Sequence, residues 1–369
     1  MQYRIGIDLS VTDRVKTGTS VYAIHLYQSL TKLDQDSFTF VLLKAPRPLP
    51  RKNLLTKFGN LAIELFWLNV LLPLQVRRYQ IDLLHMPANI ISPPVRRPQV
   101  CTIHDAHFIT NPQGRDRLWR LYANWSFHFA ARHADRIICD SNSGKDEIVH
   151  HLDADPGNID VVYLGLPQRS AAPEDGKVAA ALTPYILSVG GADANKNLPA
   201  LIRAYGQLAV SGRAHNCRLV LAGPPGGDSN IIEALIQELG LGNHVKIMGM
   251  VSDSMLAALY ENAFLFAFPS LCEGFGFPPL EAMQFGVPVI ASNAPCVPET
   301  LDQAALYFDP HNVDDMAEKI HIGLTDSKLR ERLSQAGALR SRQFSWEKSA
   351  EKTLDVYRYL LDRRHRGNN

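Results

Sequence analysis

FPSLCEGFGFPPLEAMQFGVPVIAS, residues 268–292, combines the end of a strand, a glycine-rich turn and the start of a helix. The apolar run that leads into it predicts a buried strand ending near Ser270. Gly274 and Gly276 allow the backbone of the turn to approach a ligand closely. The unpaired N–H groups of the turn and of the first helical residues favour an anion such as a diphosphate. The stretch therefore predicts a strand–turn–helix unit with an anion site at the turn.

Two carboxylates flank this turn. Glu273 precedes it, and Glu281 lies eight residues later in the first part of the helix. Each can accept hydrogen bonds from neutral hydroxyl groups of one ligand, whereas a carboxylate aimed at phosphates would repel them. The pattern therefore favours sugar hydroxyls as partners. The simpler alternative is an ordinary strand, turn and helix in which the helix dipole stabilises Glu281.

Short strand-like runs alternate with longer amphipathic runs along most of the chain, which indicates βα units and parallel sheets. At 369 residues the chain is long enough for two domains. Residues 165–184, rich in proline, alanine and charge, are interpreted as the linker between them, and a last amphipathic helix is expected at 347–364. The expected strands are 3–8, 38–43, 83–85, 99–104, 136–139 and 160–163 before the linker, and 185–189, 218–222, 245–248 and 264–268 after it.

Composition and charge exclude several classes of protein. Hydrophobic residues make up 46% of the chain and charged residues 20%, which is ordinary for a globular protein. The 38 Lys and Arg nearly balance the 37 Asp and Glu, so no nucleic-acid partner is expected. Five cysteines without paired spacing, and an N-terminus that lacks the features of a signal peptide, indicate a reduced, cytoplasmic protein.

The pattern E-x7-E within FPS-x-x-EGFG-x-P-x-LEAM resembles the retaining glycosyltransferases of family 4, which have the GT-B fold. The resemblance extends over nearly the whole chain in order and spacing. Its further segments are TIHDAHF (102–108), ADRIICDSNSGKDEI (134–148), IDVVYLGL (159–166), YILSVGGADANKNLPALIRAY (185–205), RLVLAGPPG (218–226) and VKIMGMVSD (245–253).

The resemblance implies an α/β architecture with two Rossmann-like domains that face a central cleft. The first domain, residues 1–168, would hold the acceptor and would be completed by a C-terminal helix, residues 347–369, that crosses back to it. The second domain, residues 183–346, would bind a nucleotide sugar.

Residue by residue, the resemblance assigns Glu273 to the donor sugar, Glu281 to the ribose and Lys196 to the diphosphate. A cation is needed there because negative charge grows on the leaving group as the glycosidic bond breaks. The simpler interpretation of Lys196 is an exposed loop residue. Where the family often has Arg, this chain has Gly191. The donor site would be completed by Gly190, by the turn residues Gly274, Phe275 and Gly276 near the phosphates, and by the backbone of Val251 and Ser252 near the base.

In the first domain, TGTSVY (17–22) resembles the donor-facing glycine-rich loop of the family, with Gly18 as its remaining glycine. His104 matches the histidine that reaches the donor sugar, although a lone histidine at a strand end is more often structural. Asp105 is expected to orient His104 or to cap the next segment. HDAH, which includes His107, has no metal-ligand spacing, so no metal site is predicted.

The segment from residue 53 to 79 lies in a basic part of the chain, since twelve Lys and Arg outnumber four Asp and Glu between residues 44 and 120. Two interpretations stay open: a core helix of the first domain, or a surface for anionic lipid or a lipid-linked acceptor. Its apolar runs are too short to predict a transmembrane helix. The apolar stripe is Leu61, Leu65, Leu68, Leu72 and Val76, and the flanking cations are Arg51, Lys52, Lys57, Arg77 and Arg78.

The resemblance thus implies a hexosyltransferase of bacterial O-antigen or capsule synthesis that retains the anomeric configuration and needs no metal or other cofactor. GDP-mannose is the favoured donor, and the acceptor is a saccharide or a lipid-linked saccharide. A cytoplasmic enzyme, in peripheral contact with the inner face of an anionic membrane, is expected. The alternatives are transfer from dTDP-rhamnose or a UDP-sugar, or a non-catalytic protein that binds a sugar nucleotide. A nicotinamide enzyme would need a GxGxxG turn after the first strand, which this chain lacks.

Overall fold

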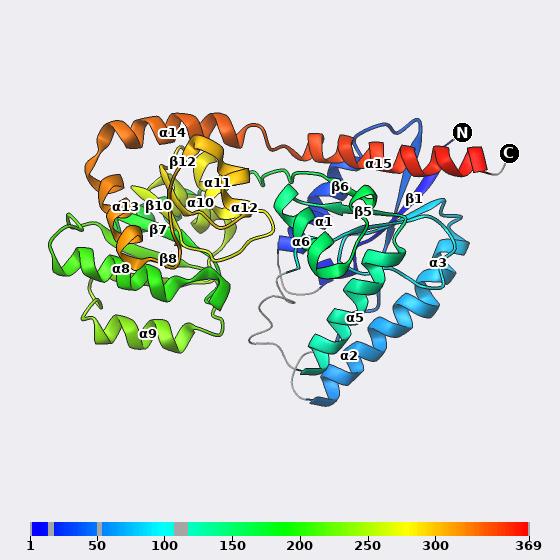
Figure 1. The fold of residues 1–369 in the computed structure, drawn as a ribbon, viewed down its shortest axis with the longest axis horizontal. Helices are drawn as coiled ribbons and strands as arrows, with labels where there is room; N and C mark the ends of the chain where they lie inside the picture. Colours follow the sequence, from blue (N-terminus) through cyan, green and yellow to red (C-terminus); the bar gives the residue numbers. More distant parts are fainter. Residues whose placement is uncertain (1, 14–17, 50–53, 107–116, 368–369) are drawn as a thin grey trace. The chain divides into compact units, whose positions relative to one another are not determined.

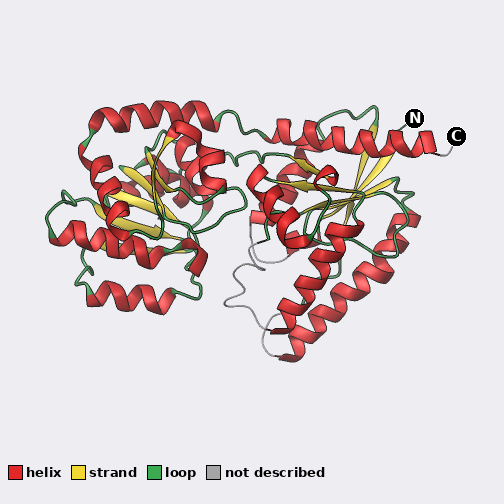
Figure 2. Cartoon of the chain, in the orientation of Figure 1, coloured by secondary structure: helices red, strands yellow, loops and turns green. Residues whose placement is uncertain are grey.

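The structure is a computed structural model that describes residues 2–13, 18–49, 54–106 and 117–367. It contains two compact units, each built around a six-stranded sheet (Figures 1 and 2). Unit 1 comprises Met1–Gly165 and Ser345–Asn369, and unit 2 comprises Leu166–Phe344. The first unit therefore receives the C-terminal segment of the chain, as the resemblance implied.

Unit 1 has a parallel sheet in the order β2-β1-β3-β4-β5-β6. Its strands are β1 (Tyr3–Asp8), β2 (Phe38–Leu43), β3 (Leu83–Met86), β4 (Gln99–Thr102), β5 (Arg136–Cys139) and β6 (Ile159–Val161). Its helices are α1 (Gly18–Leu30), α2 (Leu54–Phe66), α3 (Leu72–Arg78), α5 (Arg117–His133), α6 (Asn142–Leu152) and α15 (Trp346–Gly367), with a π-helical turn η2 (Trp67–Leu71) and the 3-10 turns η1 (Ser10–Asp13) and η3 (Pro156–Asn158).

The C-terminal helix α15 is tied to this sheet by buried polar groups. His85 on β3 contacts Tyr357 of α15, with 2.6 Å between Nδ1 and Oη, and Thr102 of β4, with 2.8 Å between Nε2 and Oγ1. Tyr22 of α1 reaches the same Thr102 hydroxyl at 2.9 Å. Burial lowers the pKa of His85 to about 3, so this imidazole stays neutral. The network thus fixes α15 to unit 1 without burying a charge.

The start of α15 packs against Gly165, which we use for a stability prediction. A Cβ added at Gly165 would lie 2.3 Å from the Trp346 nitrogen and 2.4 Å from its Cγ. Gly165→Ala should therefore lower the free energy of unfolding by about 1–3 kcal/mol through overpacking. Denaturant unfolding measures the change. Gly176→Ala is the control, because a Cβ there meets nothing within 4 Å; equal effects of the two substitutions would contradict the prediction.

Unit 2 has a parallel sheet in the order β12-β11-β10-β7-β8-β9. Its strands are β7 (Tyr185–Val189), β8 (Arg218–Ala222), β9 (Val245–Gly249), β10 (Leu265–Phe268), β11 (Val289–Ser292) and β12 (Ala305–Phe308). Its helices are α7 (Pro173–Ala180), α8 (Leu198–Val210), α9 (Ser229–Glu238), α10 (Asp253–Glu261), α11 (Phe277–Gln284), α12 (Cys296–Leu301), α13 (Val313–Thr325) and α14 (Ser327–Ser341), with the 3-10 turns η4 (Ala194–Lys196) and η5 (Asp302–Ala304).

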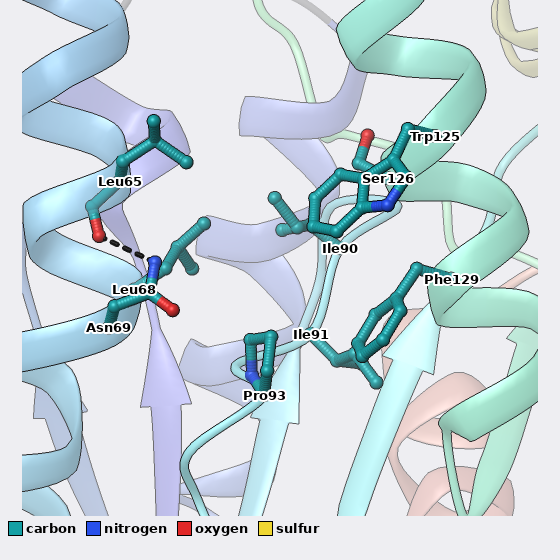
Figure 3. A pocket seen from close by; sticks show the side chains of 9 residues that line it. All are labelled: Leu65, Leu68, Asn69, Ile90, Ile91, Pro93, Trp125, Ser126 and Phe129. Atoms are coloured by element: carbon teal, nitrogen blue, oxygen red, sulfur yellow. Dashed lines mark hydrogen bonds between the residues drawn. The ribbon is translucent and has the colours of Figure 1, made fainter.

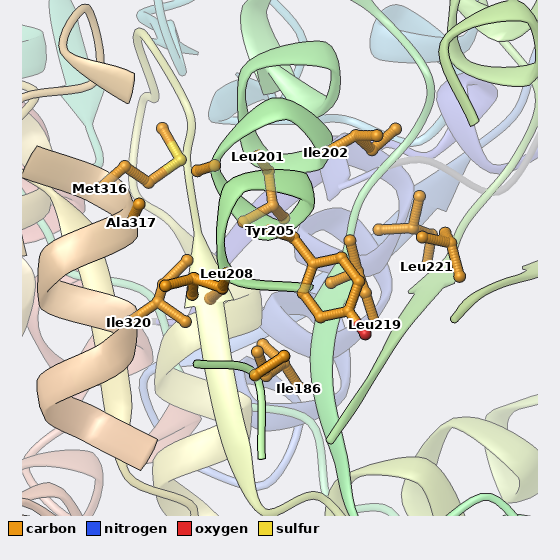
Figure 4. Packing of buried hydrophobic residues seen from close by; sticks show 14 of the residues in the cluster. Ile186, Leu201, Ile202, Tyr205, Leu208, Leu219, Leu221, Met316, Ala317 and Ile320 are labelled. Atoms are coloured by element: carbon orange, nitrogen blue, oxygen red, sulfur yellow. The ribbon is translucent and has the colours of Figure 1, made fainter. Parts of the chain in front are cut away.

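One face of this sheet is covered by α8 and α13, and the side chains between them form a continuous core (Figure 4). Tyr205 of α8 is buried there, and its hydroxyl donates to the Cys217 carbonyl at 2.8 Å. The apolar side chains include Ile186, Leu219 and Leu221 from the strands, Leu201, Ile202 and Leu208 from α8, and Met316 and Ile320 from α13. This core thus fixes the strands whose carboxyl ends form one edge of the sheet.

The interpretation of residues 165–184 as a linker is wrong, because they belong to unit 2 from Leu166 onward and contain α7. Pro173 begins this helix, and acidic residues occupy its first turn, which are favourable helix-start signals. The segment also packs on α10, where the Ala172 N–H donates to the Ser254 hydroxyl at 2.8 Å. Short amphipathic helices carry little periodicity, which explains the error.

Candidate active site

The strand order of unit 2 reverses between β7 and β10, and this reversal locates the candidate site. In open parallel sheets, ligands bind beyond the carboxyl ends of the strands at such a switch point. Gly190 directly follows β7, and the turn that contains Glu273 follows β10. The sheet topology therefore brings the two parts of the predicted donor site to one edge.

Lys196 and Glu273 contact each other at this edge, with 2.6 Å between Nζ and Oε1. Both side chains are largely buried, with 22% and 11% exposed. Asn197, in the left-handed region at φ 53°, donates to the carbonyls of Pro269 at 3.2 Å and Pro310 at 2.8 Å. These bonds anchor the lysine-bearing turn to the loop after β10. The structure thus places a cation and a carboxylate side by side. The cation suits a phosphate group of a ligand, and the carboxylate suits a neighbouring sugar hydroxyl.

The glycine-rich turn leads into α11 with the geometry that its sequence requires. Gly276 is the N-cap of this helix at φ +86°, a conformation that favours glycine. Phe275 is 3% exposed and packs edge-on against Phe277 and Phe344, with centroids 5.3 Å and 5.5 Å away. The Lys196 side chain lies beside Gly190, where an added Cβ would meet it in ordinary van der Waals contact at 3.4 Å. The ring contacts of Phe275 therefore hold the glycine-rich turn in place.

Glu281 is buried and oriented by two partners. Its Oε1 accepts from Arg169 at 2.9 Å and 3.2 Å, and its Oε2 accepts from the Tyr260 hydroxyl at 3.0 Å. Arg169 also pairs with Asp253. Ser252, next to it, uses its hydroxyl to cap α10 through the Met255 N–H at 3.0 Å. The predicted base-reading segment therefore lies near Glu281, and both the hydroxyl and the carbonyl of Ser252 accept hydrogen bonds from α10, from the Met255 N–H at 3.0 Å and the Leu256 N–H at 2.9 Å.

Sequence reasoning missed Arg169, and we predict that it positions Glu281. The two side chains are 13% and 6% exposed, so Arg169→Ala would leave a buried carboxylate without its cation and lower the free energy of unfolding by about 3 kcal/mol. A nucleoside diphosphate should bind about tenfold more weakly, because roughly one hydrogen bond of about 1.4 kcal/mol depends on the orientation of Glu281. Calorimetric titration with GDP, UDP and dTDP measures this.

The exposed pair of Arg213 and Glu318 supplies the control for that experiment. Arg213→Ala should leave both stability and nucleotide affinity nearly unchanged, since exposed pairs contribute little. Unchanged nucleotide affinity in Arg169→Ala would contradict the positioning role.

In unit 1, His104 forms a buried pair with Asp140. Their side chains are 12% and 3% exposed, with 2.7 Å between Nδ1 and Oδ2. His104 follows β4 and Asp140 follows the neighbouring β5, so the parallel sheet brings them to the same edge. Asp140 rather than Asp105 thus orients the imidazole. The ring of Tyr22 packs edge-on against it at 4.8 Å.

This pair leaves one ring nitrogen available. Among the described residues, His104 Nε2 is buried and has no hydrogen-bond partner. Burial opposes a charge on His104, but the attraction and hydrogen bond of Asp140 outweigh it and raise the pKa of the imidazole. For Asp140, burial raises the pKa of the carboxyl and the nearby His104 opposes that rise. An oriented imidazole with an unused buried nitrogen is the arrangement expected where a ligand completes the hydrogen bonding.

Gly18 was expected in a donor-facing loop, and the structure places it elsewhere. Gly18 is the first residue of α1 rather than part of a loop, and a Cβ on it would meet nothing within 4 Å of the chain. Thr17 and His107 lie outside the described residues. In the part of the chain that the structure describes, no group of three or more His, Cys, Asp or Glu could hold a metal ion.

The segment from α2 to α3 has one buried and one exposed apolar face. Trp67, Leu68, Leu72 and Val76 belong to the core of unit 1. The predicted stripe was therefore partly core, whereas Leu65 is 39% exposed. The exposed residues, named here the α2–α3 apolar face, are Phe58, Leu65, Phe66, Val70 and Leu74.

Helix α5 runs beside this segment across a small apolar cavity of about 20 Å³. Figure 3 shows Leu65 on one side of it and Trp125 and Phe129 of α5 on the other. Trp125 is 52% exposed, so the apolar surface continues onto α5. Within the described residues, Phe58–Arg78 is long and apolar enough to cross a membrane, although the sequence predicted no such helix. Its buried face, however, is part of the core, which favours a helix that lies on the surface of unit 1.

Comparison with known proteins identifies related chains for both units. Residues 17–168 match the model of Glycosyltransferase Family 4, and residues 176–340 match that of Glycosyl transferases group 1. The chain is 30% identical to O-antigen chain mannosyltransferase B of Escherichia coli over 292 residues, 77% of this chain and 76% of the relative. It is also 30% identical to the serotype-specific mannosyltransferase WbdA of Escherichia coli over 71% of this chain, which spans only 33% of that longer protein.

Solved structures share the fold over almost the full length. Sucrose-phosphate synthase from Thermosynechococcus elongatus aligns over 98% of this chain and 100% of its own, with a TM-score of 0.78 and 20% identity. Anabaena Alr3699/HepE in complex with UDP and glucose aligns over 97% of this chain and 100% of its own, with a TM-score of 0.71 and 20% identity. At these identities the similarity establishes the two-domain α/β architecture.

Proposed function

Because the chain belongs to the family 4 glycosyltransferases of the GT-B fold, in their mannosyltransferase-like branch, we propose that it transfers mannose from GDP-mannose to a saccharide hydroxyl with retention of configuration. The observation that carries the proposal is the cluster of Lys196, Glu273 and the glycine turn at the switch point of unit 2. The mannosyltransferase relatives support mannose as the sugar. The acceptor is a saccharide or a lipid-linked saccharide of a surface polysaccharide.

Each part of the donor has a proposed partner. Glu281 accepts from the ribose hydroxyls, while Lys196 and the N–H groups of the turn around Phe275 stabilise the diphosphate as it departs. Glu273 binds a sugar hydroxyl, and so does Nε2 of His104, which has no hydrogen-bond partner among the described residues. No side chain is assigned as a nucleophile, so the acceptor hydroxyl attacks the anomeric carbon from the face that the diphosphate leaves. As the bond between the anomeric carbon and the phosphate oxygen breaks, the departing diphosphate takes the proton of that hydroxyl. Such a step depends mainly on positioning and charge stabilisation.

The test of this proposal is a donor screen followed by product analysis. Thermal unfolding with GDP-, UDP- and dTDP-sugars ranks the donors, since a ligand at 100 times its dissociation constant adds about 2.7 kcal/mol to stability. Transfer from the best donor is then followed by chromatography, and the anomeric configuration is read by NMR. If only UDP-glucose or only dTDP-rhamnose stabilises the protein, that nucleotide sugar is the donor and GDP-mannose is not. Nucleotide-sugar binding without transfer or hydrolysis would favour a non-catalytic protein.

We also predict that transfer needs no metal. The proposed cation for the diphosphate is Lys196, whose Nζ lies 2.6 Å from Glu273 in a largely buried position. Activity in excess EDTA should stay within about twofold of the untreated enzyme, because chelation removes no group that stabilises the leaving charge. Loss of activity in EDTA that Mg²⁺ or Mn²⁺ restores would contradict this.

We propose further that the enzyme is cytoplasmic and binds an anionic membrane through the α2–α3 apolar face. A helix segment that buries one apolar face in the core and exposes another, beside arginines, has the pattern of an interfacial helix. Of the five cations first expected to contribute, Arg51 and Lys52 lie outside the described residues, as does the side chain of Lys57.

Vesicle co-sedimentation tests this contact. The protein should bind anionic vesicles at low salt and be released as salt shortens the Debye length. Phe66→Gln with Leu74→Gln should weaken binding, because these side chains are 51% and 54% exposed and available for insertion. Binding that is unchanged in this double variant would mean that the face contacts no lipid.

A further inference from the structure

A second cavity lies at the end of α3, where its last turn meets the loop that precedes β4. Its volume is about 280 Å³, just below the range of typical small-molecule sites. Three arginines line it: Arg77 from the helix, and Arg96 and Arg97 from the loop. The other lining residues are Pro73, Val76, Gln80, Pro94 and Val95.

The positive charge of this cavity is not neutralised by the part of the chain that the structure describes. None of its three arginines forms an ion pair with a described carboxylate, and all three are exposed. Between residues 73 and 99 the only acidic residue is Asp82, whose carboxylate accepts from the Arg4 backbone N–H at 2.9 Å. Guanidinium groups bind phosphate oxygens in a bidentate manner, so unpaired arginines around a cavity suit a phosphate group.

The loop that carries Arg96 and Arg97 is held in one conformation. Its sequence, PPVRRP at residues 93–98, contains three prolines that restrict the backbone. The buried Gln99 closes the loop, since its Nε2 donates to the carbonyls of Ser92 at 2.9 Å and Val95 at 3.3 Å. Val95 is 7% exposed and packs in the core of unit 1. Little backbone entropy is therefore lost when the two arginines bind a ligand.

The position of the cavity separates it from the donor site. The loop enters β4 at Gln99, whereas His104 follows the other end of this strand, so the arginines lie at the opposite edge of the sheet. On α3, Leu74 of the α2–α3 apolar face comes one turn before Arg77. An apolar surface thus ends beside a cationic cavity.

We infer that this cavity binds a phosphate group carried on a lipid. The inference rests on the proposed membrane contact and specifies its chemistry: acyl chains meet the α2–α3 apolar face, and the phosphate enters the space between Arg77, Arg96 and Arg97.

The experiment measures binding to two kinds of phosphatidylcholine vesicle without any nucleotide sugar. One contains phosphatidic acid, and the other contains oleate at the same surface charge, which supplies anions but no phosphate. Wild-type protein should bind the phosphatidic acid vesicles more tightly. Arg96→Gln with Arg97→Gln should weaken that binding about thirtyfold, the equivalent of about 1 kcal/mol for each cation, and should remove the preference over oleate. Inorganic phosphate at constant ionic strength should compete with the wild type.

The matched control is Arg203→Gln with Arg332→Gln, two exposed arginines of unit 2. An equal loss in this control, or equal wild-type affinity for the two vesicles, would overturn the phosphate site. If inorganic phosphate stabilises the wild type but the protein binds no vesicles, the phosphate that the cavity binds is not carried on a lipid. Because no donor is present, these results do not depend on transfer activity. A chain that binds vesicles as expected but transfers no sugar would refute only the proposed function.

Discussion

Glu273→Ala should lower kcat by a factor of about 10²–10³, the usual loss when one preorganised group that contacts the reacting centre is removed. Affinity for the nucleoside diphosphate should be unchanged or higher. The reason is the contact of 2.6 Å between Glu273 and Lys196, in which the carboxylate competes with phosphate for the ammonium group. Removing the carboxylate frees Lys196 for the diphosphate while the sugar loses a hydrogen-bond acceptor.

Kinetics with a labelled donor, together with calorimetric titration of the nucleoside diphosphate, separate these two effects. Glu261→Ala, an exposed position at the end of α10, is the control and should retain wild-type turnover. Near-normal turnover in Glu273→Ala would remove the central residue of the proposed donor site. A parallel loss of nucleotide affinity would instead place Glu273 in nucleotide binding.

The strands were predictable because a parallel sheet buries both of its faces. β3, β4 and β10 are buried at every position, and most such strands appear in the sequence as short apolar runs between turns. The equally buried β11 and the edge strand β12 were not among the expected strands. The glycine turn was predictable for a different reason, since Gly276 has a positive φ that few other residues adopt. Both signals are local, so a single sequence contains them.

The parts of the site that the sequence did not predict depend on contacts between segments that are distant in the chain. Arg169 meets Glu281 across 112 residues, and its own segment has no strand or helix periodicity. The contact of His104 with Asp140 could have been predicted from the sequence. Each residue follows one of two neighbouring parallel strands, so both lie at the same edge of the sheet. The exposed face of α2–α3 was ambiguous because apolar residues cover both sides of the helix, and periodicity alone does not tell which side is core.

Asp140→Asn should lower kcat/KM by about 10–100-fold through loss of the imidazole orientation, since Asp140 is a positioning residue that acts through His104. The readout specific to this role is the pKa of His104, which the variant should lower because the carboxylate raises it in the wild type. Nitrogen NMR of the imidazole measures the pKa directly. His85 does not interfere, because its pKa of about 3 keeps it neutral over the working range.

The same shift predicts how stability depends on pH. A histidine whose pKa is raised on folding contributes stability that is complete below its unfolded pKa of about 6.5 and is lost as pH rises through the folded value. The free energy of unfolding of the wild type should therefore fall with rising pH above about 6.5, and Asp140→Asn should flatten this slope. Asp153→Asn is the control, because its side chain is 71% exposed. A variant that lost activity while keeping the wild-type His104 pKa and pH slope would show that Asp140 acts on the fold rather than through the imidazole.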